Sequence, residues 1–192
     1  EIADLTPAFP QDVVRTTDTA IHTGGSIAHL RGKLAGDGAI IKQSACSPEL
    51  LVQTGRAVEF DSLEDLANRI DSDDLDVTAD DVLILRNAGP RGAPGMPEAG
   101  YIPIPRKLAR KGVRDMVRIS DCRMSGTAFG TIILHAEPEA AIGGPLALVE
   151  NGDSVTLDVP NRLLTLEIGD DEWNRRKDAW QSPVTSEGER GY

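Results

Sequence analysis

Apolar residues along this chain occur in short runs that are separated by glycine, proline and polar turn residues. Runs of this kind, rich in β-branched residues, are typical of strands. The pattern predicts nine strands, at residues 27–30, 39–42, 57–60, 82–86, 116–120, 131–135, 146–149, 154–159 and 163–168. We therefore expect a largely β architecture.

Three segments have a helical pattern, at residues 62–69, 104–110 and 170–180. We expect Ser62 to cap the first helix and Asp170 to cap the third, because short polar side chains accept the free N–H groups of a first turn. Gly112 is expected to close the second helix. Helices accompanying many short strands indicate a β-rich α/β fold class.

Residues 149–168 contain two turn signals, NGD and PNR, between alternating apolar runs. This arrangement predicts a β-meander. Its alternation is expected to bury Val155, Leu157 and Val159 on one face. Residues 1–25 have little periodicity, so we interpret them as an entry segment from a domain that precedes this one.

The charge balance excludes several classes of partner. Lys and Arg number 20 against 31 Asp and Glu, which gives a formal net charge of −11. An acidic chain is not expected to bind nucleic acid or an anionic membrane. No apolar run approaches the roughly 18 residues of a membrane-spanning helix.

Two isolated cysteines, Cys46 and Cys122, occur without a CxxC motif. This usage predicts a reducing compartment and no disulfide framework. The N-terminus also lacks the apolar region of a secretory signal. We therefore expect a cytoplasmic location.

Two polar loops, each following an apolar run, carry the candidate chemistry. The first, GPRGAPGMPE, ends in Glu98, and the second, RMSGT, contains Ser125. Since both follow strands, we expect them to lie at the same end of the sheet and border one cleft. A carboxylate on a loop fixed by proline and glycine suits a hard cation such as Mg²⁺. Alternatively, Glu98 is a solvent-exposed acid.

Ser125 lies in a tight turn in which Gly126 permits backbone N–H groups to face an anion. Thr127 and the amide of Gly126 are candidate partners of a substrate carboxylate or hydroxyl group. Alternatively, Ser125 is an ordinary turn residue. His135 lies on the next predicted strand, but no Ser–His–Asp order supports an acyl-transfer triad.

Four ordered blocks carry a family resemblance: TGGSIAHLRGKLAGDGAIIKQSACSPELL at 23–51, GPRGAPGMPEAGYIP at 89–103, SDCRMSGTAFGTIILHAEPEAAIGGPLALVENGD at 120–153 and EWNRRKDAW at 172–180. With these blocks the chain resembles the C-terminal part of the dihydroxy-acid and sugar-acid dehydratases, the IlvD/Edd family. The segment RMSGTAFGTIILH is more similar to the branch that acts on aldonic acids, such as arabinonate and xylonate, than to the branch that makes branched-chain amino-acid precursors. The resemblance implies a swivelling β/β/α domain, a barrel-like sheet flanked by helices, over residues 26–182, followed by a truncated tail at 183–192.

The resemblance also implies roles for the two loops. The glutamate of GxPGMPE is a magnesium ligand in the family, which assigns this role to Glu98, and the serine of RMSGT is the proposed base, which assigns that role to Ser125. The parent reaction removes water from a 2,3-dihydroxy carboxylic acid to give a 2-keto-3-deoxy acid. It requires Mg²⁺ and an iron–sulfur cluster, expected to be of the 2Fe–2S type, for which neither Cys46 nor Cys122 is at a matching position.

In the family, the cluster cysteines belong to an N-terminal domain that this sequence does not contain. We therefore expect the missing domain of the same polypeptide to be the partner of this chain, the intact enzyme to be a homo-oligomer, and the isolated chain to be inactive. Three alternatives remain: a dihydroxy-acid dehydratase of branched-chain amino-acid synthesis, a non-catalytic swivelling subunit that docks on a larger partner, and a small subunit of an aconitase-type isomerase.

Overall fold

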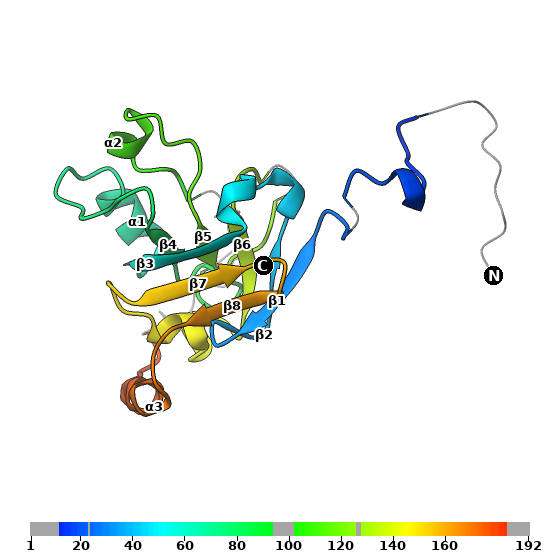
Figure 1. The fold of residues 1–192 in the computed structure, drawn as a ribbon. Coiled ribbons are helices and arrows are strands. Elements are labelled where there is room, and N and C mark those ends of the chain that lie inside the picture. Colours follow the sequence, from blue (N-terminus) through cyan, green and yellow to red (C-terminus); the bar gives the residue numbers. More distant parts are fainter. Residues whose placement is uncertain (1–11, 23, 94–101, 126–127, 184–192) are drawn as a thin grey trace.

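The computed structural model describes residues 12–22, 24–93, 102–125 and 128–183 (Figure 1). In this part of the chain, eight strands form a closed barrel in the order β1-β2-β6-β5-β4-β3-β7-β8. Their bounds are β1 Ala28–Gly32, β2 Ala35–Ile41, β3 Val52–Phe60, β4 Val82–Leu85, β5 Arg118–Ser120, β6 Ile132–Glu137, β7 Ser154–Asp158 and β8 Leu163–Leu166. The β-rich α/β class predicted from the sequence is confirmed.

Strands β3, β4, β5 and β6 are parallel neighbours, whereas β2 pairs with β6, and β7 with β3, in antiparallel fashion. All four residues of β4 are buried, as expected for a parallel strand covered on both faces. Ile84 packs with the core inside the barrel, and Leu83 packs with a second core outside it. The parallel strands therefore separate two hydrophobic cores.

The outer core lies between the parallel strands and two helices, α1 (Leu63–Arg69) and α2 (Arg106–Ala109). Figure 1 shows these helices together on one side of the barrel, with α3 (Asp170–Ala179) apart from them. Ser62 caps α1 as predicted, because its side chain accepts the N–H of Asp65 at 3.1 Å. No helix of the described residues is long and apolar enough to cross a bilayer.

Two local predictions were wrong. Residues 146–149 were expected to form a strand, but Pro145–Leu148 is a 3₁₀ helix. Pro145 favours a helical start, and the closed barrel has no free edge for a ninth strand. Asp170 was expected to cap α3, but Gly169 holds that position and Asp170 pairs with Lys33 at 2.9 Å.

The meander is confirmed, since β7 and β8 pair antiparallel and Val155, Leu157 and Val159 are all buried. Further 3₁₀ helices lie between strands at Gln43–Ala45, Pro48–Leu50 and Ala140–Ile142, and another, Thr17–Thr19, precedes β1. Residues 12–22 run away from the barrel (Figure 1). The assignment of residues 1–25 as an entry segment stays a prediction.

Candidate active site

The two candidate loops begin at the same edge of the sheet. Strands β4 and β5 are parallel, with Leu85 opposite Ser120 at their carboxyl ends. Strand β6 is parallel to β5 and ends at the same edge. The crevice beyond the carboxyl ends of parallel strands is the usual place for a ligand site.

Ser125 lies half-buried in the crossover that joins β5 to β6. Its carbonyl accepts the N–H of Ala128 at 3.1 Å. Glu98, Gly126 and Thr127 lie outside the described residues. Their assigned roles, and the shared cleft with Ser125, stay predictions.

His135 fixes the backbone beside Ser125. Its side-chain Nε2 accepts the N–H of Met124 at 2.9 Å, and its own N–H donates to the carbonyl of Cys122 at 2.9 Å. A neutral imidazole with its proton on Nδ1 satisfies this arrangement. His135 therefore holds the loop between β5 and β6 that contains Ser125 (the serine loop) through its bond to Met124.

A β-bulge directs His135 toward the loop. The pairing of β6 with β2 shifts between the pairs Ile40↔Leu134 and Gly38↔Glu137, so β6 has an extra residue there. His135 has a φ of 52°, which is rare for a residue with a side chain. Bulges often reorient a side chain next to a functional site. No turn residue in this part of β6 signals the bulge, so sequence reasoning missed the role of His135.

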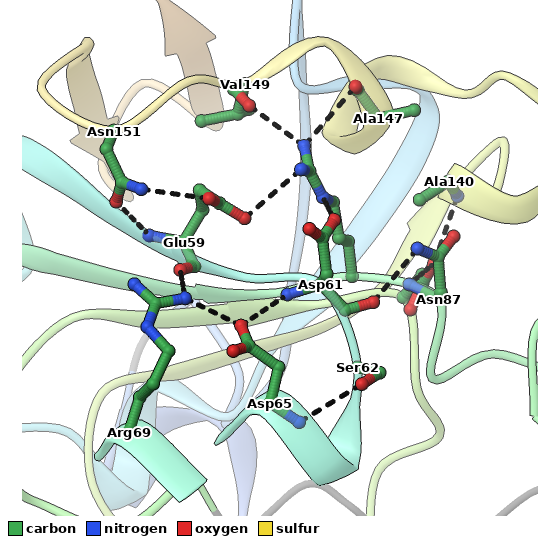
Figure 2. A network of polar contacts seen from close by, with 12 residues as sticks. Glu59, Asp61, Ser62, Asp65, Arg69, Asn87, Ala140, Ala147, Val149 and Asn151 are labelled. Carbon is green, nitrogen blue, oxygen red and sulfur yellow. Dashed lines mark hydrogen bonds and ion pairs between the residues drawn. The ribbon is translucent and has the colours of Figure 1, made fainter. Parts of the chain in front are cut away.

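Asp121, the residue after β5, is a buried carboxylate surrounded by backbone donors. Its oxygens accept the N–H groups of Asn87 at 3.2 Å, Ala88 at 2.9 Å and Ala140 at 3.0 Å. Figure 2 shows Asn87 and Ala140 side by side in this network. Burial raises the pKa of Asp121, and the three N–H groups oppose that rise.

Glu139 provides a second carboxylate at this edge. It accepts the N–H of Arg91 at 2.8 Å, so it contacts the glycine-rich loop that leads toward Glu98. Burial raises the pKa of Glu139 as well. The path of this loop up to residue 93 is therefore set by contacts with residues that follow β5 and β6.

Asp115 and Arg118 form a buried ion pair at the other end of β5, with 2.8 Å between Oδ1 and Nη2. Arg118 also donates to the carbonyls of Ile102 at 3.0 Å and Phe129 at 3.3 Å. Asp115 accepts the N–H of Thr131 at 2.9 Å. Although burial opposes it, the bonds from Thr131 and Ser47 and the charge of Arg118 lower the pKa of Asp115.

The chain has two cysteines, fewer than the four thiolates that usually hold an iron–sulfur cluster. Burial raises the pKa of Cys46 and of Cys122 to about 11. Within the described ranges, no three His, Cys, Asp or Glu side chains are grouped so that they could hold a metal ion. The expectation that the cluster ligands lie outside this chain stays a prediction.

A polar network joins β3 to the turn before β7, and it is linked to the contacts of Asp121 because the Asn87 side chain donates to the Asp61 carbonyl at 3.0 Å. The side chain of Asn151 donates to the Glu59 carboxylate at 2.9 Å, and its oxygen accepts the Glu59 N–H at 2.9 Å (Figure 2). Arg86 pairs with Asp61 at 2.6 Å and with Glu59 at 3.2 Å. Its charge is thus matched by these carboxylates, and the network stabilises the connection between these elements.

Comparison with known proteins agrees with this architecture. The model of the family "Dihydroxy-acid/6-phosphogluconate dehydratase C-terminal" matches residues 12–192. L-arabinonate dehydratase of Rhizobium leguminosarum bv. trifolii (strain WSM2304) is 52% identical over 171 residues, which are 89% of this chain and 30% of that protein. The 6-deoxy-6-sulfo-D-gluconate dehydratase of Pseudomonas putida is 52% identical over 174 residues, 89% of this chain and 30% of that protein.

Dihydroxy-acid dehydratases are more distant. That of Methanothrix thermoacetophila (strain DSM 6194 / JCM 14653 / NBRC 101360 / PT) is 40% identical over 186 residues, 95% of this chain and 33% of that protein. The chain thus spans about a third of the length of these relatives. The family match over nearly the whole chain confirms the resemblance in the sequence, and the chain belongs to the dihydroxy-acid/6-phosphogluconate dehydratase family, whose C-terminal domain it matches.

Proposed function

We propose that this chain acts as the C-terminal domain of a longer hydro-lyase that dehydrates an aldonic acid to a 2-keto-3-deoxy acid. The observation that carries the proposal is the common origin of the two loops at the carboxyl edge of β4 and β5. Relatives named for sugar-acid substrates are 52% identical, against 40% for a dihydroxy-acid dehydratase. This difference favours an aldonic acid over a branched-chain precursor.

Ser125 is the proposed base. Its Oγ, as an alkoxide, takes the proton from C2. As the electron pair of the broken C–H bond forms the C2=C3 double bond, the C3–O bond breaks, and the departing hydroxide takes the proton back from Ser125 to leave as water. The enol then tautomerises to the 2-keto acid. The contact of His135 with Met124 holds the loop on which this proton transfer occurs, and transfer requires a base within hydrogen-bond reach.

Glu98 is the proposed Mg²⁺ ligand. Mg²⁺ and an iron–sulfur cluster, bound mainly by residues outside this chain, would supply the Lewis acidity that an α-proton and a hydroxide leaving group need. Gly126 and Thr127 are proposed to contact the carboxylate or a hydroxyl group of the substrate. Cys46 and Cys122 are too few to hold such a cluster, which supports cluster ligands from elsewhere in the longer protein.

The test uses the full-length enzyme that carries this chain, with formation of 2-keto-3-deoxy acid from pentonates as the assay. Ser125→Ala should lower kcat by about 10²–10⁴-fold, the usual contribution of a positioned base, with iron and magnesium content unchanged. Ser154→Ala, an exposed serine on β7, is the matched control and should retain parental turnover.

Glu98→Gln should behave differently from Ser125→Ala, because a neutral amide is a poorer ligand for a hard cation. We expect weaker retention of Mg²⁺ and partial recovery of turnover when Mg²⁺ is added. Near-parental turnover of Ser125→Ala would return Ser125 to the role of a turn residue and place the base in another domain.

A further inference from the structure

Strand β5 carries a buried charged residue near each of its ends, and neither is assigned a step in the proposed reaction. Asp121 follows the strand and is 2% exposed, and Arg118 begins it and is 3% exposed. A buried charge is costly unless its hydrogen bonds are satisfied. Both charges therefore need hydrogen-bond partners within the fold.

Asp121 joins the loops that follow three parallel strands. Its donors Asn87 and Ala88 come directly after β4, Ala140 comes after β6, and Asp121 itself opens the serine loop after β5. No hydrogen bond or ion pair from a cationic side chain to Asp121 is seen in the described part of the chain. Its charge is matched by N–H groups whose positions the carboxylate fixes.

Arg118 contacts both the loop that contains Glu98 and the loop that contains Ser125, near the C-terminal end of each. Its Nη1 donates to the carbonyl of Ile102, the first described residue after the segment that contains Glu98. Its Nη2 donates to the carbonyl of Phe129, four residues after Ser125, and also to Asp115. Asp115 in turn accepts both the N–H and the hydroxyl of Thr131, where the serine loop ends.

We propose that Asp121 and Arg118 are positioning residues for two loops: the loop after β4 that leads to Glu98 (the glutamate loop) and the serine loop between β5 and β6. Asp121 fastens the starts of these loops to β5, and Arg118 fastens the segments where they end. The inference rests on the proposed function for the roles of Glu98 and Ser125. A loop that is fastened at its start and its return presents its side chains in fewer conformations. Misplacing a reacting group by about 1 Å can cost about a hundredfold in rate, so loss of either fastening should lower turnover without removing the base.

The first test measures the fastening without activity, by amide hydrogen exchange of the 192-residue chain. Asp121→Asn keeps the shape of the side chain but weakens three charge-assisted bonds. Exchange at Asn87, Ala88 and Ala140 should accelerate by about tenfold to a hundredfold, the range for bonds to a charged group. Unchanged exchange at these three amides would overturn the proposal.

Asp81→Asn is the matched control. Asp81 is a 4% exposed aspartate that accepts the N–H of Thr78 and pairs with Arg56, but it precedes β4 and lies at the opposite edge of the sheet. This variant should accelerate exchange at Thr78 and leave Asn87 and Ala88 protected. Equal acceleration at these two amides in both variants would indicate general destabilisation and contradict the proposal.

Arg118→Lys keeps the charge but loses the planar group that reaches three carbonyls at once, those of Met116, Ile102 and Phe129. Exchange should accelerate over residues 128–131, and iron and magnesium content of the full-length enzyme should stay parental. Arg118→Lys also keeps the proposal testable if Asp121→Asn fails to fold. Unchanged exchange over these residues would remove Arg118 from the proposal.

The second test measures turnover in the full-length enzyme. Asp121→Asn and Arg118→Lys should each lower kcat by about tenfold to a hundredfold, with the pH dependence of kcat retained because Ser125 is present. Asp81→Asn should keep parental kcat. An inactive parental enzyme would refute the proposed function. The exchange data would still show whether Asp121 and Arg118 hold the two loops. Faster exchange with parental kcat would show that the fastening does not serve the reaction.

Discussion

Gly89, the first glycine of GPRGAPGMPE, offers a quantitative test of how tightly the glutamate loop is held. A Cβ at this position would lie 2.6 Å from Oε2 and 2.7 Å from Cδ of Glu139, and 3.0 Å from the carbonyl oxygen of Asp121. Glu139 is only 8% exposed, so its carboxylate has little room to move away. We expect Gly89→Ala to force it off the N–H of Arg91.

The expected cost combines two effects. Inserting an atom into a packed region costs about 1–3 kcal/mol. The lost bond between Glu139 and the Arg91 N–H contributes about 1.5 kcal/mol, the low end for a charged acceptor, because Arg91 is exposed and water can replace the acceptor. We therefore expect Gly89→Ala to lower the free energy of unfolding by about 2.5–4.5 kcal/mol, measured by urea denaturation and far-UV circular dichroism at pH 7.

A double-mutant cycle isolates the clash from other effects. In a Glu139→Ala background the carboxylate is absent, so Gly89→Ala should cost at least about 1 kcal/mol less than in the parental chain. Gly112→Ala is the control for glycine loss alone, since Gly112 has a φ of +93° and a Cβ added there would meet no atom within 4 Å. It should cost about 1–2 kcal/mol in both backgrounds. Additive costs of Gly89→Ala and Glu139→Ala would refute the contact between them.

Three further predictions concern other parts of the chain. Ser62→Ala should cost about 0.5–2 kcal/mol in urea denaturation because α1 loses its N-cap, and a cost near zero would contradict the cap. The pKa of Asp115 is lowered below its ordinary value of 3.8. The stabilisation that its ionised form provides is therefore present above pH 3.8 and lost as the pH falls through the native pKa. In urea titrations over this acid range, the free energy of unfolding should fall less for Asp115→Asn than for the parental chain. Cys46 and Cys122, whose pKa values are raised to about 11, should react with a disulfide reagent at pH 8 far more slowly in the native than in the urea-unfolded chain, and equal rates would contradict their burial.

Strands could be predicted from sequence because their signal is local. Eight of the nine predicted segments overlap the observed strands, each of them a short apolar run between turn residues. The ninth, at residues 146–149, has the same composition but becomes a 3₁₀ helix after Pro145. An apolar run alone does not reveal whether a neighbouring strand has a free edge to pair with.

The candidate site could be predicted only in part. The loops were identifiable from their glycines, prolines and position after apolar runs, and their common edge follows from the parallel pairing of β4 and β5. The roles of His135, Asp121 and Arg118 could not be predicted, because each depends on contacts with backbone atoms distant in the sequence. A backbone donor has no signature in the side-chain pattern.

The bonding of Asp121 has a consequence for how the site can move. Its three donors come from the loops after β4 and β6, while the carboxylate belongs to the loop after β5. If one loop shifted alone, it would leave a buried oxygen or N–H group without its partner, which typically costs about 1–3 kcal/mol per group. The bases of the three loops should therefore stay together with the parallel strands, and any closure over a substrate has to involve the loop tips or a movement of the whole barrel.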